Sequence, residues 1–147
     1  MSSVTVSIDI AASPQEVWDV IMDPHKLEDW VTIHRKLRDV SDDPLRDQSE
    51  MDQTLCLRGV NFNVKWTVVE YDPPRRVVME GRGPARSHAR IEDRLTEHDG
   101  GTRFEYVNEF HAPGGPFGAA ASRVLVGGVP QREASRSLEQ LKSLLER

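Results

Sequence analysis

Three polar side chains, Gln53, Asp93 and Asn108, interrupt an alternation of apolar residues in the middle of the chain. If Gly100 and Gly101 form a two-residue turn, Asp93 and Asn108 face each other across a hairpin, and the Asn amide can donate to the carboxylate. A buried polar group without a partner costs about 1–3 kcal/mol, so these side chains need each other, a water molecule or a ligand. The pattern predicts either a satisfied structural pair or the polar anchor of a binding site.

Proton transfer is the reaction that a buried carboxyl group could perform. Desolvation would raise the pKa of Asp93 and make it the best candidate for a catalytic acid or base beside a carbonyl group, with Tyr106 and His34 as helpers. A surface position for His34 is the alternative. The other histidines are expected on the outer face, at a turn or in a loop, and Cys56 has the parity of the outer face.

Motifs for other chemistry are missing from the sequence. No two histidines have metal-ligand spacing on one face with a carboxylate. The sequence has no glycine-rich phosphate loop and no Gly-x-Ser-x-Gly motif. We therefore expect no metal site and no cofactor.

The elements that must position these residues begin with a strand and short helices. Apolar residues alternate with polar ones over 4–10, which is the period of a half-buried strand. Ser13-Pro14-Gln15-Glu16 combines an N-cap, a proline at the first helical position and a glutamate three residues after the cap. Asp23-Pro24 ends this helix, residues 25–30 can add one or two turns before the chain extends again, and residues 41–47 form a loop.

The pattern over residues 51–112 predicts an antiparallel meander with three turns. Residues that would face each other across these turns share one face of the sheet, and most of these pairs are apolar. We place the turns at Gly59-Val60, at residues 72–75 and at Gly100-Gly101. The opposite, outer face alternates in charge through Arg90, Glu92, Arg94, Arg103, Glu105 and Glu109. The inner pairs that follow are Leu57 with Phe62, Leu55 with Val64, Gln53 with Trp66, Met51 with Val68, Val68 with Met79, Trp66 with Gly81, Leu95 with Tyr106, Asp93 with Asn108, Ile91 with Phe110 and Ala89 with Ala112.

The last third predicts a helix over about 115–146, broken or kinked near Gly127-Gly128. Apolar residues recur at helical spacing on both sides of the break, in the stripes Phe117, Ala121, Val124, Leu125 and Ala134, Leu138, Leu141, Leu145. A helix with such a stripe should cover the apolar face of the sheet, so the fold class is α+β with one domain over residues 1–147.

Residues 4–24, Trp30 six residues after Pro24, and residues 69–76 (Val-Glu-Tyr-Asp-Pro-Pro-Arg-Arg) resemble the START and birch-pollen-allergen superfamily, in particular its polyketide cyclase/dehydrase branch. The resemblance covers essentially the whole chain. It implies the helix-grip fold, a curved antiparallel sheet wrapped around a long C-terminal helix, with a cavity between the two.

The resemblance and the parity of the strands together indicate which residues would line that cavity. Most are apolar, which favours a hydrophobic ligand that could stack on Trp66 and Tyr106. A solid core without a cavity is the alternative. The expected ligand-binding residues are Gln53, Phe62, Trp66, Met79, Ile91, Asp93, Tyr106, Asn108, Phe110, Phe117 and Val124.

Composition excludes several classes of protein. The 147 residues carry 19 basic and 24 acidic side chains, a net charge of −5, which argues against nucleic-acid binding. No apolar stretch is long enough to cross a bilayer and no signal pattern opens the chain, so we expect a cytoplasmic protein without integral membrane association. The oligomeric state, monomer or homodimer, stays open.

Three functions remain: a carrier or sensor of a small hydrophobic molecule (lipid, polyketide or aromatic), a polyketide cyclase, aromatase or dehydratase, and a protein-interaction module of the chaperone-activator type. The sequence favours binding, since only Asp93 is a secure acid or base on the inner face.

Overall fold

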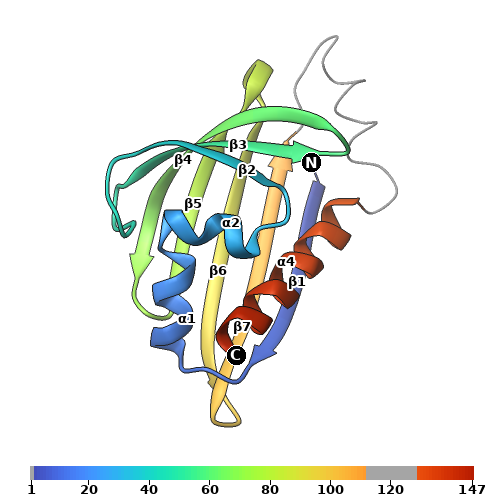
Figure 1. The fold of residues 1–147 in the computed structure, drawn as a ribbon. Helices are drawn as coiled ribbons and strands as arrows, with labels where there is room; N and C mark the ends of the chain where they lie inside the picture. The colour runs from blue at the N-terminus through green and yellow to red at the C-terminus, as the bar shows by residue number, and fades with distance from the viewer. Residues whose placement is uncertain (1, 112–128) are drawn as a thin grey trace.

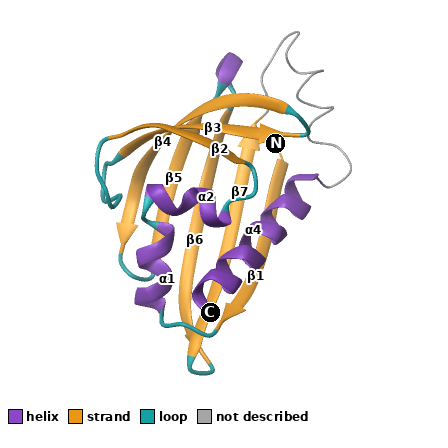
Figure 2. Cartoon of the chain, in the orientation of Figure 1, coloured by secondary structure: helices purple, strands orange, loops and turns teal. Residues whose placement is uncertain are grey.

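The computed structural model describes residues 2–111 and 129–147. Seven strands form one antiparallel sheet in the order β1-β7-β6-β5-β4-β3-β2, and helices α1, α2 and α4 lie on one face of it (Figures 1 and 2). We call this the inner face. The elements are β1 (Ser2–Ile10), α1 (Pro14–Ile21), η1 (Pro24–Lys26), α2 (Leu27–Trp30), β2 (His34–Val40), β3 (Glu50–Leu57), β4 (Val60–Asp72), β5 (Arg76–Arg82), η2 (Pro84–Arg86), β6 (His88–His98), β7 (Gly101–His111) and α4 (Val129–Leu145).

Helix α1 begins where the sequence predicts. The backbone of Ser13 is extended, and its Oγ accepts a hydrogen bond from the backbone N–H of Glu16 at 3.2 Å. This cap satisfies one of the free N–H groups at the helix start. The apolar side of α1 is buried against β6 and β7 through Val17, Trp18, Val20 and Ile21.

The β6–β7 hairpin turns one residue earlier than predicted. Its turn residues are Asp99 and Gly100, with φ of 50° and 80°, the left-handed values that a type I′ turn requires. Gly101 instead opens β7, where a Cβ would overlap the carbonyl oxygen of Ile10. Gly101 is therefore explained by the close approach of β1, and not by the turn.

This earlier turn shifts the pairing by two residues, so each inner residue stays on its face but has a different partner. Asp93 pairs with Tyr106 and Asn108 pairs with Ile91. The predicted pairing of Asp93 with Asn108 is wrong, and the two are diagonal neighbours. Phe110 likewise faces Ala89 and not Ile91, and Leu95 faces Phe104.

The β3–β4 hairpin is displaced in the same way. Arg58 and Gly59, with φ of 49° and 80°, form its turn in place of the predicted Gly59-Val60. The observed inner pairs are Leu57 with Val60, Leu55 with Phe62, Gln53 with Val64 and Met51 with Trp66. The predicted pairs across the β4–β5 turn, Val68 with Met79 and Trp66 with Gly81, are confirmed.

Helix α4 lies along β1 and runs in the same direction (Figure 1). The Gln131 amide donates to the carbonyl of Thr5 at 3.2 Å, and eleven residues later the Lys142 ammonium donates to the carbonyl of Asp9 at 2.8 Å. Leu138 and Leu141, from the predicted second stripe, are buried beneath the helix. The first stripe, the break at Gly127-Gly128 and the pairing of Ala112 lie outside the described residues.

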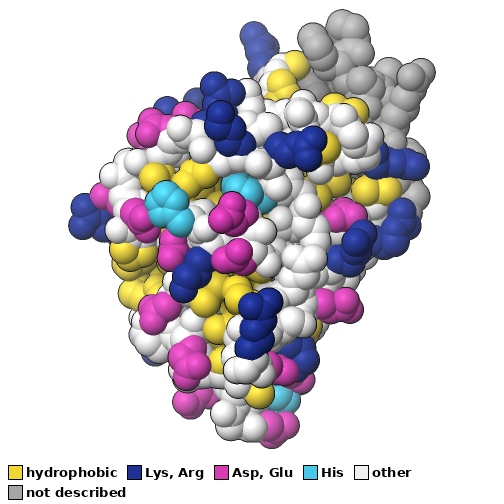
Figure 3. All heavy atoms as spheres, in the orientation of Figure 1, with side chains coloured by type: hydrophobic (Ala, Val, Ile, Leu, Met, Phe, Trp, Pro, Cys, Tyr) yellow, Lys and Arg dark blue, Asp and Glu magenta, His cyan; other side chains and the backbone are white. Residues whose placement is uncertain are grey.

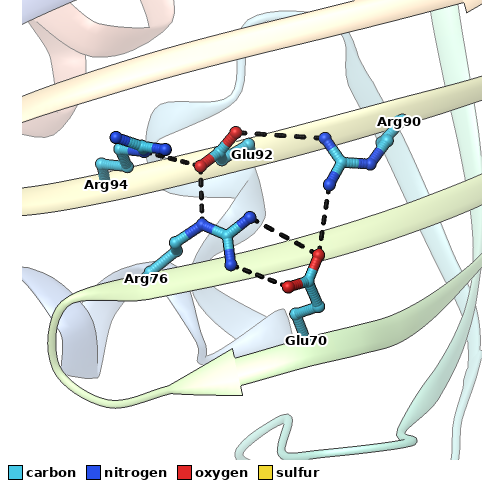
Figure 4. Close-up of polar contacts among 5 residues, drawn as sticks. All are labelled: Glu70, Arg76, Arg90, Glu92 and Arg94. Carbon is cyan, nitrogen blue, oxygen red and sulfur yellow. Dashed lines mark hydrogen bonds and ion pairs between the residues drawn. The ribbon is translucent and has the colours of Figure 1, made fainter.

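The outer face carries a network of charged side chains from β4, β5 and β6 (Figure 4). We call it the outer charge network: Glu70, Arg76, Arg90, Glu92 and Arg94. Glu92 accepts from the Nε atoms of Arg76 and Arg94, each at 2.6 Å, and Glu70 lies 2.8 Å from Arg76. These arginines lower the pKa of both carboxyl groups, so both stay ionised at neutral pH.

Candidate functional site

The Trp66 ring packs against a glycine in the neighbouring strand of the inner face. A Cβ placed on Gly81 would come within 2.6 Å of Cε3 and Cζ3 of Trp66 and within 2.8 Å of Val64. Any side chain at position 81 would thus displace the indole. Because Gly81 leaves this space open, the ring can lie close against β5, and Trp66 is buried.

Trp66 also begins a chain of hydrogen bonds that reaches β2 through Gln53. The indole N–H donates to Gln53 Oε1 at 2.9 Å, and Gln53 Nε2 lies 2.8 Å from His34 Nδ1. An indole N–H can only donate, so it fixes the orientation of the Gln53 amide. The amide NH₂ then donates to His34 Nδ1, which leaves the histidine proton on Nε2.

This hydrogen bond fits a neutral His34. Burial lowers the pKa of His34, and the nearby Glu28 opposes that effect only in part. A protonated ring would bring its Nδ1–H against the Gln53 amide hydrogens. The structure therefore places His34 beside Gln53 as a half-buried, neutral imidazole, between the cavity position and the surface position that the sequence left open.

The second polar group of the inner face combines Asp93 of β6 with Tyr106 and Asn108 of β7. We call these three residues the inner polar cluster. Asp93 is only 5% exposed. The Asn108 Nδ2 atom donates to the Tyr106 hydroxyl at 3.1 Å. Among the described residues, neither Asp93 Oδ1 nor Asn108 Oδ1 has a hydrogen-bond partner, although both atoms are buried.

The electrostatics of the inner polar cluster follow from its burial. Desolvation, with a smaller contribution from the adjacent Glu92 charge, raises the pKa of Asp93 to about 7. Desolvation and the Asp93 charge likewise raise the pKa of Tyr106, while the hydrogen bond from Asn108 lowers it. At neutral pH the cluster can therefore hold Asp93 in either protonation state beside an un-ionised phenol.

The other predicted ligand-binding residues in the described part of the chain share the inner face with this cluster. Phe62, Met79, Ile91 and Phe110 are half-buried, whereas Gln53 and Trp66 are buried. Phe117 and Val124 lie outside the described residues. Figure 3 views the molecule from the helix side and shows hydrophobic side chains at the surface between α1 and α4.

A shallow groove lies between the start of α1 and the β4–β5 turn. Its lining includes Ser13, Arg75, Arg76 and Arg94. Arg76 and Arg94 are bound to Glu92, so these two guanidinium groups already have anionic partners. None of the predicted ligand-binding residues lines this groove.

Other reactive groups of the described residues are dispersed. Within residues 2–111 and 129–147, no three His, Cys, Asp or Glu side chains gather closely enough to hold a metal ion. Cys56 is a free, half-buried thiol. His88 and His111 stack on each other at 4.2 Å between ring centroids, across the outer face of β6 and β7. The helices in the described ranges are all too short or too polar to span a membrane.

Two features of the site were missed by the sequence reasoning. The bond between Tyr106 and Asn108 had a signal, since residues two apart in a strand lie on the same face. The partnership of His34 with Gln53 had none, because β2 pairs with β3 through two irregular steps that the sequence does not mark.

A curved antiparallel sheet with a C-terminal helix across its inner face defines a helix-grip protein. Among solved structures, the Zhui aromatase/cyclase from Streptomyces sp. R1128 has this fold with a TM-score of 0.83 at 17% identity, over 99% of this chain and 94% of that one. The predicted α+β helix-grip fold is confirmed.

Sequence comparisons agree with the fold. The model of the family "Polyketide cyclase / dehydrase and lipid transport" matches residues 1–146. An uncharacterized protein of Mycobacterium tuberculosis, Rv1546, is 30% identical over 146 residues, which cover 98% of this chain and 99% of the relative. Another protein of that organism, named toxin Rv0910, is 24% identical over 127 residues, with 85% and 88% covered. The chain belongs to the polyketide cyclase/dehydrase and lipid transport family, as its resemblance predicts.

Proposed function

We propose that this protein binds a small hydrophobic molecule between the inner face of the sheet and helix α4. The observation that carries the proposal is the incomplete burial of apolar side chains on the face that the helices cover. A solid core would bury these side chains fully, as it does Phe104 and Val77 nearby. The half-buried residues are Val6, Ile8, Phe62, Met79, Ile91, Tyr106 and Phe110.

The energetics favour a ligand of apolar character. Each Å² of apolar surface removed from water contributes roughly 25 cal/mol, so a ligand that covers these side chains gains affinity from its area. Tyr106, which is half-buried, adds aromatic surface to the same face from β7. The family's lipid-transport description supports a ligand of this kind.

The test is titration of the protein with Nile red, an uncharged apolar dye, with native mass spectrometry to detect a co-purified ligand. The variant Ile91→Asn places an amide on the inner face and should weaken dye binding roughly tenfold. The neighbouring outer residue supplies the matched control, Arg90→Asn, which should bind as the unmodified protein does. Absence of dye binding, or equal loss in both variants, would contradict the proposal.

A second candidate function is acid–base catalysis on a polyketide-like carbonyl compound. The observation that favours it is Asp93 with a pKa of about 7, directly opposite Tyr106. The test follows deuterium uptake at the carbon between the carbonyls of an apolar β-diketone. Catalysis predicts uptake above the buffer rate that Asp93→Asn abolishes, whereas unchanged uptake in that variant would remove Asp93 from the reaction.

A further inference from the structure

The inner polar cluster has hydrogen-bonding capacity that the described residues do not use. Asp93 Oδ1 and Asn108 Oδ1 are buried acceptors that find no donor within residues 2–111 and 129–147. The Tyr106 oxygen accepts from Asn108, and no bond from the Tyr106 proton is seen among the described residues. In the described part of the chain, the cluster therefore has two buried acceptors and one phenolic donor that are not used.

We infer that the ligand bound on the inner face carries a hydroxyl or other uncharged hydrogen-bond donor at its polar end, and that anionic ends such as carboxylates are excluded. This inference rests on the proposed function, because it assumes that the ligand lies against the inner face. It adds which kind of hydrophobic molecule the site selects.

The argument from geometry begins with placement. Asp93 and Tyr106 are direct partners across β6 and β7, and Asn108 is two residues beyond Tyr106 on the same face. Side chains at such positions have Cβ atoms about 5–8 Å apart. A single hydroxyl group can therefore reach the cluster, donate to Asp93 or Asn108 and accept from Tyr106.

The hydrogen-bonding groups of a carboxylate do not match those of this cluster. It brings only acceptors to a place that already has two unpaired ones, so at most Tyr106 could bind it. Its charge would also face Asp93, which is ionised in the majority of molecules at about pH 8 because the pKa of this buried group is about 7. Glu92, the residue before Asp93 in β6, adds to the negative potential at Asp93.

The sheet neighbours of Asp93 offer no cation that could pair with an anionic ligand. The neighbours of Asp93 in the sheet are Val77 on β5 and Tyr106 on β7, and Leu95 follows it on the same face of β6. The arginines close in sequence, Arg90 and Arg94, lie on the outer face in contact with Glu92. No basic side chain among these sheet neighbours is available to pair with an anionic ligand.

Three naphthalene derivatives of similar size test the inference: naphthol, its methyl ether and naphthoate. Binding is measured by calorimetry at about pH 8, where Asp93 is largely ionised. Naphthol should bind about tenfold more tightly than the methyl ether, although the ether is the more hydrophobic, because only naphthol can donate a hydrogen bond. Naphthoate should bind more weakly than both.

Variants of the cluster locate the selectivity. Asp93→Asn should reduce the discrimination against naphthoate, and thermal unfolding of the variant verifies that it is folded. Glu105→Gln, an exposed neighbour of Tyr106, is the matched control and should leave the order of the three compounds unchanged.

The outcomes separate the two proposals. Equal affinity for the three compounds would overturn the inference while the proposed function stands, as would tighter binding of naphthoate. Discrimination against naphthoate that is undiminished in Asp93→Asn would place the selecting group elsewhere and overturn the inference as well. If Nile red binds and none of the three compounds does, the inference alone is overturned. If Nile red does not bind either, the proposed function is wrong and the inference fails with it.

Discussion

Asp93 and Glu92 are consecutive carboxylic acids in β6, yet they lie on opposite faces of the sheet in opposite environments. Glu92, on the outer face, accepts from Arg76 and Arg94, and these arginines lower its pKa. Asp93, on the inner face, has an unpaired buried oxygen and a pKa raised to about 7. The same chemical group is thus held as a stable anion on one face and as a readily protonated acid on the other.

The difference separates polar residues that satisfy one another from polar residues whose hydrogen-bonding capacity is unused among the described residues. The outer charge network satisfies its members with one another, at distances of 2.6 to 3.9 Å. The inner polar cluster leaves two buried acceptors open, each of which costs roughly 1–3 kcal/mol. This free-energy cost is removed when another molecule supplies the missing donors.

The largest expected effect is the opposite pH dependence of stability at the two carboxyl groups. The pKa of Asp93 rises from 3.8 in the unfolded chain to about 7 in the folded chain, so folding favours its protonated form. The resulting stabilisation is complete below about pH 4 and is lost as the pH rises through 7, a change of up to about 4 kcal/mol. Urea unfolding across this range should show Asp93→Asn increasingly more stable than the unmodified protein toward pH 8.

Glu92→Gln is the matched control for that experiment and should behave in the opposite sense. The pKa of Glu92 is lower in the folded chain than its ordinary value of 4.5, so its contribution is present above that pH and is lost as the solution becomes more acidic. The variant should be destabilised by about 1–3 kcal/mol at neutral pH. Parallel stability curves for Asp93→Asn and Glu92→Gln would show that the two faces do not differ as described.

A smaller effect is expected at two other neighbours on opposite faces, Gly81 and Glu80 of β5. Gly81→Ala pushes a methyl group into the Trp66 ring and should lower the free energy of unfolding by about 1–3 kcal/mol, with a shift in tryptophan emission. Glu80→Ala, on the exposed side, should change stability by less than about 0.5 kcal/mol. An unshifted emission spectrum in Gly81→Ala would mean that Trp66 does not rest on this glycine.

The smallest effect is expected at the exposed edge of the outer charge network. The Glu70 side chain is 49% exposed, so solvent screens its ion pairs with Arg76 and Arg90 and these pairs should contribute little to stability. Chemical unfolding of Glu70→Gln should show a small loss at low salt that disappears at about 1 M salt. A loss that persists at high salt would indicate that Glu70 is less accessible to solvent than its exposure implies.

Local patterns in the sequence located several elements of the fold. Alternation of apolar residues located β1, and the Ser13 cap located the start of α1. The faces of the strands also followed, because a register error of two residues keeps every side chain on its own side. This is why Asp93 could be assigned to the inner face even though its partner was wrong.

Which residues pair across the hairpins depends on contacts between residues that are distant in the sequence. The pair Gly100-Gly101 suggests a turn, but Gly101 is fitted to the backbone of Ile10, about ninety residues earlier. Asp99 takes the left-handed φ of 50° that a two-residue turn needs, a position usually filled by glycine, asparagine or aspartate. For the same reason the bond from Gln53 to His34 could not be predicted, since it depends on how the edge strand β2 bends onto β3.

The strand order determines when the inner face can form during folding. Each of the ladders from β2 to β7 joins strands consecutive in the chain, whereas β1 pairs only with β7. Ile10 faces Thr102 and Ser2 faces Phe110, so 92 to 108 residues separate the partners. Such distant pairings form slowly, because the entropy cost of closing a long loop precedes the favourable contacts between the strands. During synthesis β1 must therefore wait for nearly the whole sheet to emerge, and the helix that lies along it can cover the inner face only afterwards.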